Sequence, residues 1–389
     1  MTRPRGKIIV FGIVFWYPLA GVTFQFLHYL IGLRNLGWDV YYIEDSARMI
    51  YDAATGDYTY DWASTGNVER LGAVLDAHGF AGKWAARCHY DYRIWGMTET
   101  ELAQVYRDAD AFLNITGGQE ILDEHLRIPH KIYVETDPVK TEILVAQGHE
   151  EMIATLDAHD THFSFGENFG VPDCGVPMGR HKWLPTRQPV ALELWPVLDA
   201  PGKNYTTVAT WNNRGNDIVW RGEHYGWSKR PEFLKLVSLP RRRKVSFEIA
   251  AGVPAEDRAL LDANGWQMVD SLAVSSDAET YRDYIRGSRA EFTVAKDQNI
   301  RLRSGWFSDR SCCYLAAGRP VINQDTAFGN ILPTGRGLYS FLTLDDVLAA
   351  IDAIESDYAG NCRAAREIAE EFFSAEKVMG SLCARAGLS

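Results

Sequence analysis

Four basic residues lie close together in the sequence and could form an anion-binding site. The last of them lies in the first turn of a predicted helix at 308–317, whose first-turn amides lack partners within the helix and whose dipole adds positive potential. The stretch therefore predicts a pocket for an anion such as a diphosphate. A solvated basic loop in front of an ordinary strand–helix unit is the alternative interpretation. The basic residues are Lys296, Arg301, Arg303 and Arg310.

The composition makes this cluster more informative than it would be in a basic protein. The chain has 389 residues, with 40 Lys and Arg against 51 Asp and Glu, so its formal net charge is −11. Such a balance argues against non-specific nucleic-acid binding, which needs a basic surface. The length exceeds what a single hydrophobic core usually serves, and it predicts two domains of about 150–200 residues.

Cysteine usage and the apolar N-terminal run bear on the compartment. The six cysteines follow no disulfide or zinc spacing, since Cys312 and Cys313 are adjacent, and this predicts reduced thiols and a cytoplasmic location. The apolar run from Lys7 to Phe15 is too short to span a bilayer and is typical of a buried strand. We therefore expect no stable membrane insertion. The sequence leaves the oligomeric state open.

Strands and helices alternate along the whole chain. A strand at 7–15, a helix at 23–36 and a strand at 39–43 begin a Rossmann-like half, although the G-x-G-x-x-G fingerprint of dinucleotide binding is absent. The following predicted elements are a helix at 98–106 and strands at 111–115, 131–135 and 161–165. A second series has strands at 205–210, 244–250, 267–270, 290–295 and 320–323, and helices at 229–239, 255–264, 278–286, 308–317, 344–356, 360–372 and 374–386.

A proline-rich segment between Pro172 and Gly202 separates the two series and is the predicted inter-domain connection. The predicted fold class is α/β, with two Rossmann-like domains facing a cleft. We place the N-terminal domain at 1–190, the C-terminal domain at 191–370, and a C-terminal helix at 371–389 that could pack back on the N-terminal domain. Ligands of open parallel sheets bind beyond the carboxyl ends of the strands, so the cleft is the expected site.

Two segments resemble the GT-B glycosyltransferases, particularly the group 1 and spore-maturation-type branches. Residues 310–325, RSCCYLAAGRPVINQD, are similar to the family run that ends in alanine-x-glycine-x-proline-valine-isoleucine. The loop Pro18–Gly21 and the run Leu33–Val40 resemble the glycine loop and the strand entry that open the family's first domain. With the domain order added, the resemblance covers most of the chain.

The resemblance implies a glycosyltransferase that needs neither metal nor cofactor. Its C-terminal domain would bind a nucleoside diphosphate sugar as co-substrate, and its N-terminal domain would bind a small-molecule or glycan acceptor. Many retaining relatives carry two glutamates eight positions apart, for the donor sugar and the ribose. Gly305 and Cys313 stand at those positions here. A nucleotide-sugar epimerase or hydrolase, or a non-catalytic sugar-nucleotide-binding protein, would use the same fold.

A diphosphate leaving group must be stabilised by Lys, Arg and helix amides when no metal is bound. Arg310 is the first candidate, although it could instead pair with Asp309. Asp325 and Thr326 follow a strand and could bind sugar hydroxyls or form an Asx turn. Gly21 would let the backbone approach the donor or simply permit a tight turn. The predicted donor-binding residues are Gly21, Lys229, Lys296, Arg301, Arg303, Ser308, Arg310, Asp325 and Thr326.

An inverting transferase also needs a base that faces the acceptor hydroxyl. Carboxylates and imidazoles near strand ends of the first domain are the candidates, and a retaining mechanism would need none of them. The sequence does not distinguish between the two mechanisms. The candidate bases are Glu44, Asp45, Glu120, Asp137 and His162.

Overall fold

The computed structural model describes residues 5–388, except 54, 201 and 214. Its first half forms an eight-stranded sheet of order β10-β9-β8-β7-β1-β2-β5-β6, in which only the β5–β6 pair is antiparallel. The strands are β1 (Lys7–Phe11), β2 (Asp39–Ser46), β5 (Trp84–Cys88), β6 (Ile94–Trp95), β7 (Ala111–Ile115), β8 (His130–Glu135), β9 (Thr161–Ser164) and β10 (Trp183–Pro185).

The second half forms a six-stranded, fully parallel sheet of order β15-β14-β11-β16-β17-β18. The central strands of both sheets are buried on both faces, as continuous apolar runs predict. The strands are β11 (Asn204–Val208), β14 (Ser246–Ala250), β15 (Gln267–Val269), β16 (Ala290–Thr293), β17 (Val321–Gln324) and β18 (Leu338–Phe341). The predicted α/β class, with two Rossmann-like sheets, is confirmed.

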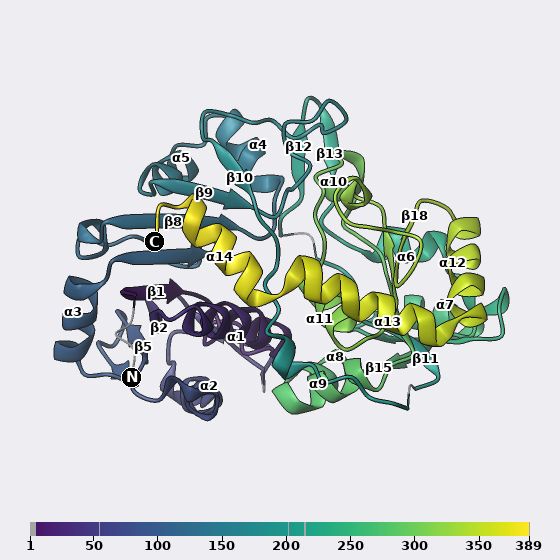
Figure 1. The fold of residues 1–389 in the computed structure, drawn as a ribbon, viewed down its shortest axis with the longest axis horizontal. Coiled ribbons are helices and arrows are strands. Elements are labelled where there is room, and N and C mark those ends of the chain that lie inside the picture. Colours follow the sequence, from purple (N-terminus) through teal and green to yellow (C-terminus); the bar gives the residue numbers. More distant parts are fainter. Residues whose placement is uncertain (1–4, 54, 201, 214, 389) are drawn as a thin grey trace.

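Helices connect the strands of each sheet and cover them (Figure 1). Those of the first half are α1 (Ala20–Asn35), α2 (Asn67–Leu75), α3 (Glu99–Asp108), α4 (Lys140–Ala146) and α5 (Glu150–Asp157). Those of the second half are α6 (Arg230–Lys235), α7 (Ala255–Ala263), α8 (Ser271–Ser275), α9 (Ala278–Arg286), α10 (Asp297–Arg301), α11 (Asp309–Ala316), α12 (Leu344–Ser356), α13 (Tyr358–Ile368) and α14 (Ala375–Arg385). No helix in these described ranges has the length and apolarity needed to cross a lipid bilayer.

The boundaries of several elements differ from the sequence prediction. The first strand ends at Phe11 instead of residue 15, because the Phe15 and Trp16 amides turn away and donate to the Glu44 carboxylate. Strands β5 and β18 were not predicted. The segment between the predicted strand at 205–210 and the predicted helix at 229–239 contains a small hairpin, β12 (Ile218–Trp220) and β13 (Glu223–Tyr225). A second hairpin, β3 (Ile50–Asp52) and β4 (Asp57–Thr59), follows β2.

One apolar cluster spans the two halves, which are also joined twice by the chain. Phe24 of α1 packs on Trp195 of the connection and on Tyr281 of α9, with ring centroids 4.8 and 6.0 Å apart. Figure 1 shows α13 and α14, in yellow, running from the second half back across the first. There α14 packs on α1, and the Asn35 amide donates to Glu376 at 2.7 Å.

Candidate functional site

Three cations meet where the carboxyl ends of the two sheets approach each other. Lys229 precedes α6, Lys296 follows β16, and Arg310 lies in the first turn of α11. The charges of Arg310 and Lys296 both act on Lys229. The structure thus brings together three of the predicted donor-binding residues, which come from separate segments of the second half.

Lys229 is the cation of this group whose side chain makes no hydrogen bond or ion pair with the residues that the structure describes. This side chain is 7% exposed. Burial, reinforced by the charges of Arg310 and Lys296, holds its pKa well below the usual range. A largely buried ammonium with no hydrogen bond or ion pair is unfavourable. The charges of Glu291 and Asp137 offset only part of that cost, and an anionic ligand would offset more of it.

Arg310 is held by protein groups instead. Its Nε donates to Glu291 at 2.6 Å and its Nη2 to Thr293 Oγ1 at 2.7 Å, and a third donor reaches the Val208 carbonyl. The partner is therefore the buried Glu291 of β16, and the alternative pairing with Asp309 is not observed. These contacts fix the guanidinium at the carboxyl ends of β11 and β16.

Lys296 links the two halves. Its Nζ lies 2.8 Å from Asp137, which follows β8 of the first sheet, and 3.1 Å from the centroid of the Trp227 ring. Trp306 of the second half also donates its indole N–H to the Thr136 carbonyl at 2.9 Å. The loop after β8 is therefore the part of the first sheet that lies against the cation group.

Most of the other predicted donor-binding side chains form bonds that hold neighbouring loops together, and Ser308 is an exception. Arg301 pairs with Glu223 and Asp297 and stacks on Tyr225, and Arg303 pairs with Asp173 and Asp325 at 2.9 and 3.1 Å. Asp325 also accepts from the Ala327 amide, and the Thr326 hydroxyl donates to the Trp306 carbonyl.

Ser308 is buried at the N-cap position of α11, next to Arg310. Its hydroxyl makes no hydrogen bond among the residues described, so it remains available to a ligand. Gly21 does not form the expected turn, because it lies inside the first turn of α1 facing Tyr281. A Cβ at Gly21 would lie 3.4 Å from the Tyr281 hydroxyl oxygen, which is nearly ordinary contact.

The positions of the two family glutamates hold no acid. Gly305 has a φ of +80°, and a Cβ there would lie 2.5 Å from the Asn168 backbone nitrogen, so no larger residue fits this backbone. Cys313 is buried in α11, and burial raises the pKa of its thiol well above the usual value. Neither position can supply the carboxylate that retaining relatives use.

Glu44 and Asp45, two of the candidate bases, are engaged in the first half. The Glu44 carboxylate accepts from the Phe15 and Trp16 amides and from the Tyr42 hydroxyl, so it holds the β1–α1 loop. Burial raises the pKa of Glu44 to about 7 despite these donors.

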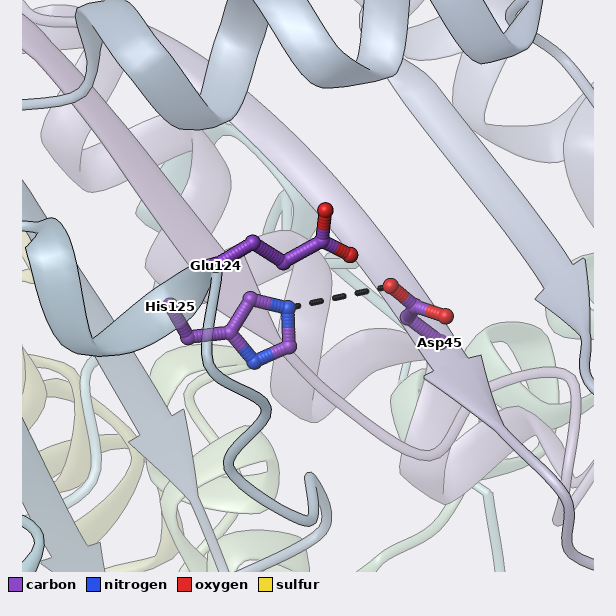
Figure 2. Close-up of side chains that lie close together, drawn as sticks. All are labelled: Asp45, Glu124 and His125. Carbon is purple, nitrogen blue, oxygen red and sulfur yellow. Dashed lines mark ion pairs between the residues drawn. The ribbon is translucent and has the colours of Figure 1, made fainter.

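Asp45 is the centre of a polar network that includes a possible metal-ligand group with Glu124 and His125, drawn in Figure 2. Arg87 donates to both Asp45 oxygens, at 2.8 and 2.5 Å, and also pairs with Glu124. Burial opposes ionisation of Asp45, but His125, Arg87 and Tyr106 outweigh it and hold its pKa far below the usual range. A metal ion would compete with Arg87 for the same oxygens, and the network therefore fits a structural ion-pair cluster.

The remaining candidate bases lie in different places. His162 is inside β9 and not at its end, and its Nε2 lies 2.8 Å from the carbonyl oxygen of Leu156, which is in the last turn of α5 just before that strand. Glu120 is exposed in the loop after β7. Asp137 is the candidate that reaches the cation group, through Lys296.

Three acids near Asp137 were missed by the sequence reasoning. Burial raises the pKa of Glu135, at the end of β8, and burial together with the Glu135 charge raises that of Glu142 to about 8. Burial and the Asp137 charge raise the pKa of Asp309 to about 7. Glu135 ends a predicted strand and could have been found by that signal, whereas Glu142 and Asp309 are identified only by packing.

The turn between β8 and α4 is strained. Val139 has a φ of +102°, which is unusual for a β-branched residue, and its amide donates to Glu142 at 2.6 Å. Such strain persists only where the surroundings hold it, and it is common at binding sites. The strained backbone at Val139 thus lies in the same loop as Asp137, next to the acids with raised pKa values.

No protein-family model and no curated protein matches the sequence. Solved structures match over nearly the full length. An α-glucosyltransferase in complex with UDP and DNA aligns with a TM-score of 0.59 and 9% identity, covering 98% of this chain and 99% of that one. AviGT4, a glycosyltransferase involved in avilamycin A biosynthesis, aligns with a TM-score of 0.57 and 9% identity, over 98% and 97%.

Sucrose-phosphate synthase from Thermosynechococcus elongatus is similar as well, with a TM-score of 0.53 and 12% identity over 98% of both chains. At these identities the likeness establishes the fold alone. It agrees with the two parallel sheets, their order along the chain and the helix that returns to the first half. The chain therefore has the GT-B fold, as its sequence predicted.

Proposed function

We propose that this protein is a glycosyltransferase that transfers a sugar from a nucleoside diphosphate sugar to an acceptor without a metal ion. The observation that carries the proposal is the unpartnered, buried Lys229 ammonium at the carboxyl ends of the second sheet. A diphosphate would supply further counter-charge. Glycosyltransferases with this fold, with UDP or UDP-glucose bound in the structures, support a uridine nucleotide as the first donor to test.

Each cation has a distinct role in this proposal. Lys229 contacts the diphosphate and stabilises the negative charge that develops on it as the glycosidic bond breaks. Lys296, held by Asp137, adds positive potential from the side of the first half. Arg310, fixed by Glu291, contributes its field and holds the start of α11, where Ser308 and the free amides face the ligand.

Asp137 is the candidate base whose position best supports a role in transfer. It comes from the first half, which would hold the acceptor, and its carboxylate is about half exposed beside Lys296. Asp309, with its pKa near 7, is a second group there that could exchange a proton at neutral pH. Neither residue stands at a position of the two glutamates that retaining relatives carry, and the positions of Asp137 and Asp309 favour an inverting mechanism.

Replacing Lys229 by methionine tests the donor site directly. We expect Lys229→Met to weaken UDP binding at least tenfold, which corresponds to about 1.4 kcal/mol. The unliganded variant should be at least as stable as the wild type, because a buried charge without a partner is removed. Thermal unfolding with and without UDP, GDP, ADP and dTDP measures both effects.

The control is Lys244→Met, which removes an exposed lysine of the same half and should leave both quantities unchanged. The titrations are repeated with EDTA and with Mg²⁺, and we expect equal UDP binding in both. Stabilisation by none of the four nucleotides at millimolar concentration would contradict the donor site. Binding only with Mg²⁺ would contradict metal independence.

One observation favours a second candidate, a protein that binds sugar nucleotides without turning them over. Gly305 and Cys313 stand where retaining relatives keep carboxylates, and the structure leaves no room for an acid at 305. Product analysis separates the two functions. Donor consumption with a broad acceptor panel supports transfer, whereas tight UDP binding with no product over that panel supports the binding protein.

A further inference from the structure

Exposed aromatic side chains gather on the first half. The structure's described residues include twelve large apolar side chains that are exposed, and five of them come from residues 49–92. Large exposed apolar areas are uncommon on soluble proteins and usually mark binding surfaces. The five are Met49 at 41%, Tyr58 at 45%, Tyr60 at 43%, Tyr90 at 63% and Tyr92 at 86% exposure.

Tyrosine rings pack in two pairs in the loops that follow three neighbouring strands. The rings of Tyr60 and Tyr90 are stacked, with centroids 4.6 Å apart and planes 17° from parallel. Tyr58 packs edge-on against Tyr17, and their hydroxyl oxygens lie 2.9 Å apart. We name Tyr17, Tyr58, Tyr60, Tyr90 and Tyr92 the tyrosine surface. These residues follow β1, β2 and β5, so the surface lies at the carboxyl ends of the first sheet.

Arg48 anchors the loops beneath this surface. Its guanidinium lies 4.7 Å from the Trp16 ring centroid and donates to the Gly118 carbonyl at 2.7 Å. The Trp62 indole donates to the Arg48 carbonyl at 2.9 Å, and the Tyr51 amide donates to the Trp16 carbonyl. The rings are therefore presented on a cross-linked base, which lowers the entropy lost when a ligand binds.

The charges around the tyrosine surface exclude a polyanion. Residues 46–62 and 89–93 contain four aspartates against two arginines. Arg48 is engaged as described, and Arg93 pairs with Asp91 at 3.2 Å. A surface for nucleic acid needs free cations along it. Although several solved structures of this fold contain DNA, the surface here lacks the charge for that partner.

We propose that the tyrosine surface binds the sugar rings of an uncharged carbohydrate acceptor. The apolar C–H face of a pyranose ring packs on a tyrosine ring, and the phenol hydroxyls can bond to the sugar hydroxyls. This inference rests on the proposed glycosyltransferase function, because it names the acceptor of that transfer reaction. It places the acceptor at the carboxyl ends of β1, β2 and β5, beside the loop after β7 that Arg48 contacts.

The test uses the full-length protein on an array of neutral oligosaccharides, with uronate-containing oligosaccharides and duplex DNA as further probes. We expect binding to one or more neutral oligosaccharides and to neither polyanion. Tyr90→Ala and Tyr60→Ala should each weaken that binding at least tenfold, whereas Tyr90→Phe, which keeps the ring, should retain most of it. The matched control is Leu260→Ala, which removes an exposed apolar side chain of α7 in the second half.

UDP-dependent stabilisation of the same variants separates this proposal from the donor site. The tyrosine variants should keep the UDP response, and Lys229→Met should keep oligosaccharide binding. If the protein binds neutral oligosaccharides but no nucleotide, the result supports the tyrosine surface as a carbohydrate site and contradicts the proposed glycosyltransferase function. The surface proposal is overturned by no binding to the neutral array, by binding that the alanine variants leave unchanged, or by DNA or uronate binding that depends on these tyrosines.

Discussion

At the residue scale, the acids around the loop after β8 make stability depend on pH. Glu142 is buried, and burial together with the neighbouring Glu135 charge raises its pKa to about 8 from an ordinary value of 4.5. The folded state therefore binds this proton more tightly than the unfolded state. The resulting stabilisation is fully present below about pH 4.5 and is lost as the pH rises to about 8.

Glu142→Gln tests this prediction. Glutamine keeps one oxygen for the Val139 amide but cannot ionise. We expect the stability of the variant relative to the wild type to increase between pH 5 and pH 8.5 by roughly 2–4 kcal/mol, since one pKa unit is about 1.4 kcal/mol. Urea unfolding across that range measures it. Glu151→Gln, at an exposed position of α5, is the control, and equal pH profiles for both variants would contradict the prediction.

At the element scale, the close packing of α14 on α1 requires a glycine. A Cβ at Gly32 of α1 would lie 2.8 Å from the Ala375 Cβ and 3.0 Å from its carbonyl oxygen. Gly380 of α14 is also in a helix interior, but the nearest atom to its added Cβ is 4.0 Å away. Both glycines therefore have a helical backbone, but an added Cβ would clash at Gly32 and would have room at Gly380.

We predict opposite effects for the same substitution. Alanine in a helix interior is favoured over glycine by about 0.5–1 kcal/mol, so Gly380→Ala should stabilise the protein by about that amount. Gly32→Ala should destabilise it by about 1–3 kcal/mol, because α14 must move away from α1. Chemical denaturation of both variants measures the difference. If both substitutions stabilise the protein, α14 does not pack closely against α1 in solution.

At the scale of the whole molecule, the Asp137–Lys296 ion pair joins the two halves beside the proposed donor site. Lys296 is largely buried, and Asp137 is half exposed, so the pair should contribute more than a surface ion pair does. We expect a double-mutant cycle with Asp137→Asn and Lys296→Met to give a coupling of about 1–2 kcal/mol in unfolding free energy.

The exposed pair Lys377–Glu371 provides the control cycle, with Lys377→Met and Glu371→Gln. Its coupling should lie near 0–0.5 kcal/mol. Additive effects of the Asp137 and Lys296 substitutions would mean that the two halves do not make this contact in solution.

Several local features could be predicted from the sequence alone. The helices at 278–286 and 344–356 and the strand at 111–115 have the predicted limits, because their apolar periodicity and their flanking turn residues are local signals. The position of Lys296 at a strand's carboxyl end followed from the same pattern. Strand β5 was missed, since Trp84–Cys88 has neither a long apolar run nor clear alternation.

The sequence by itself determined the alternation of strands and helices, which favours parallel sheets, and the positions of Lys229, Lys296 and Arg310 at the ends of these elements, because such signals depend on residues close together in the chain. Only the tertiary structure decided which of these cations are neutralised. Arg310 finds Glu291 on a neighbouring strand, Lys296 finds Asp137 159 residues away, and Lys229 finds no partner among the described residues. Ion pairs form between segments that packing brings together, so spacing in the sequence carries no record of them.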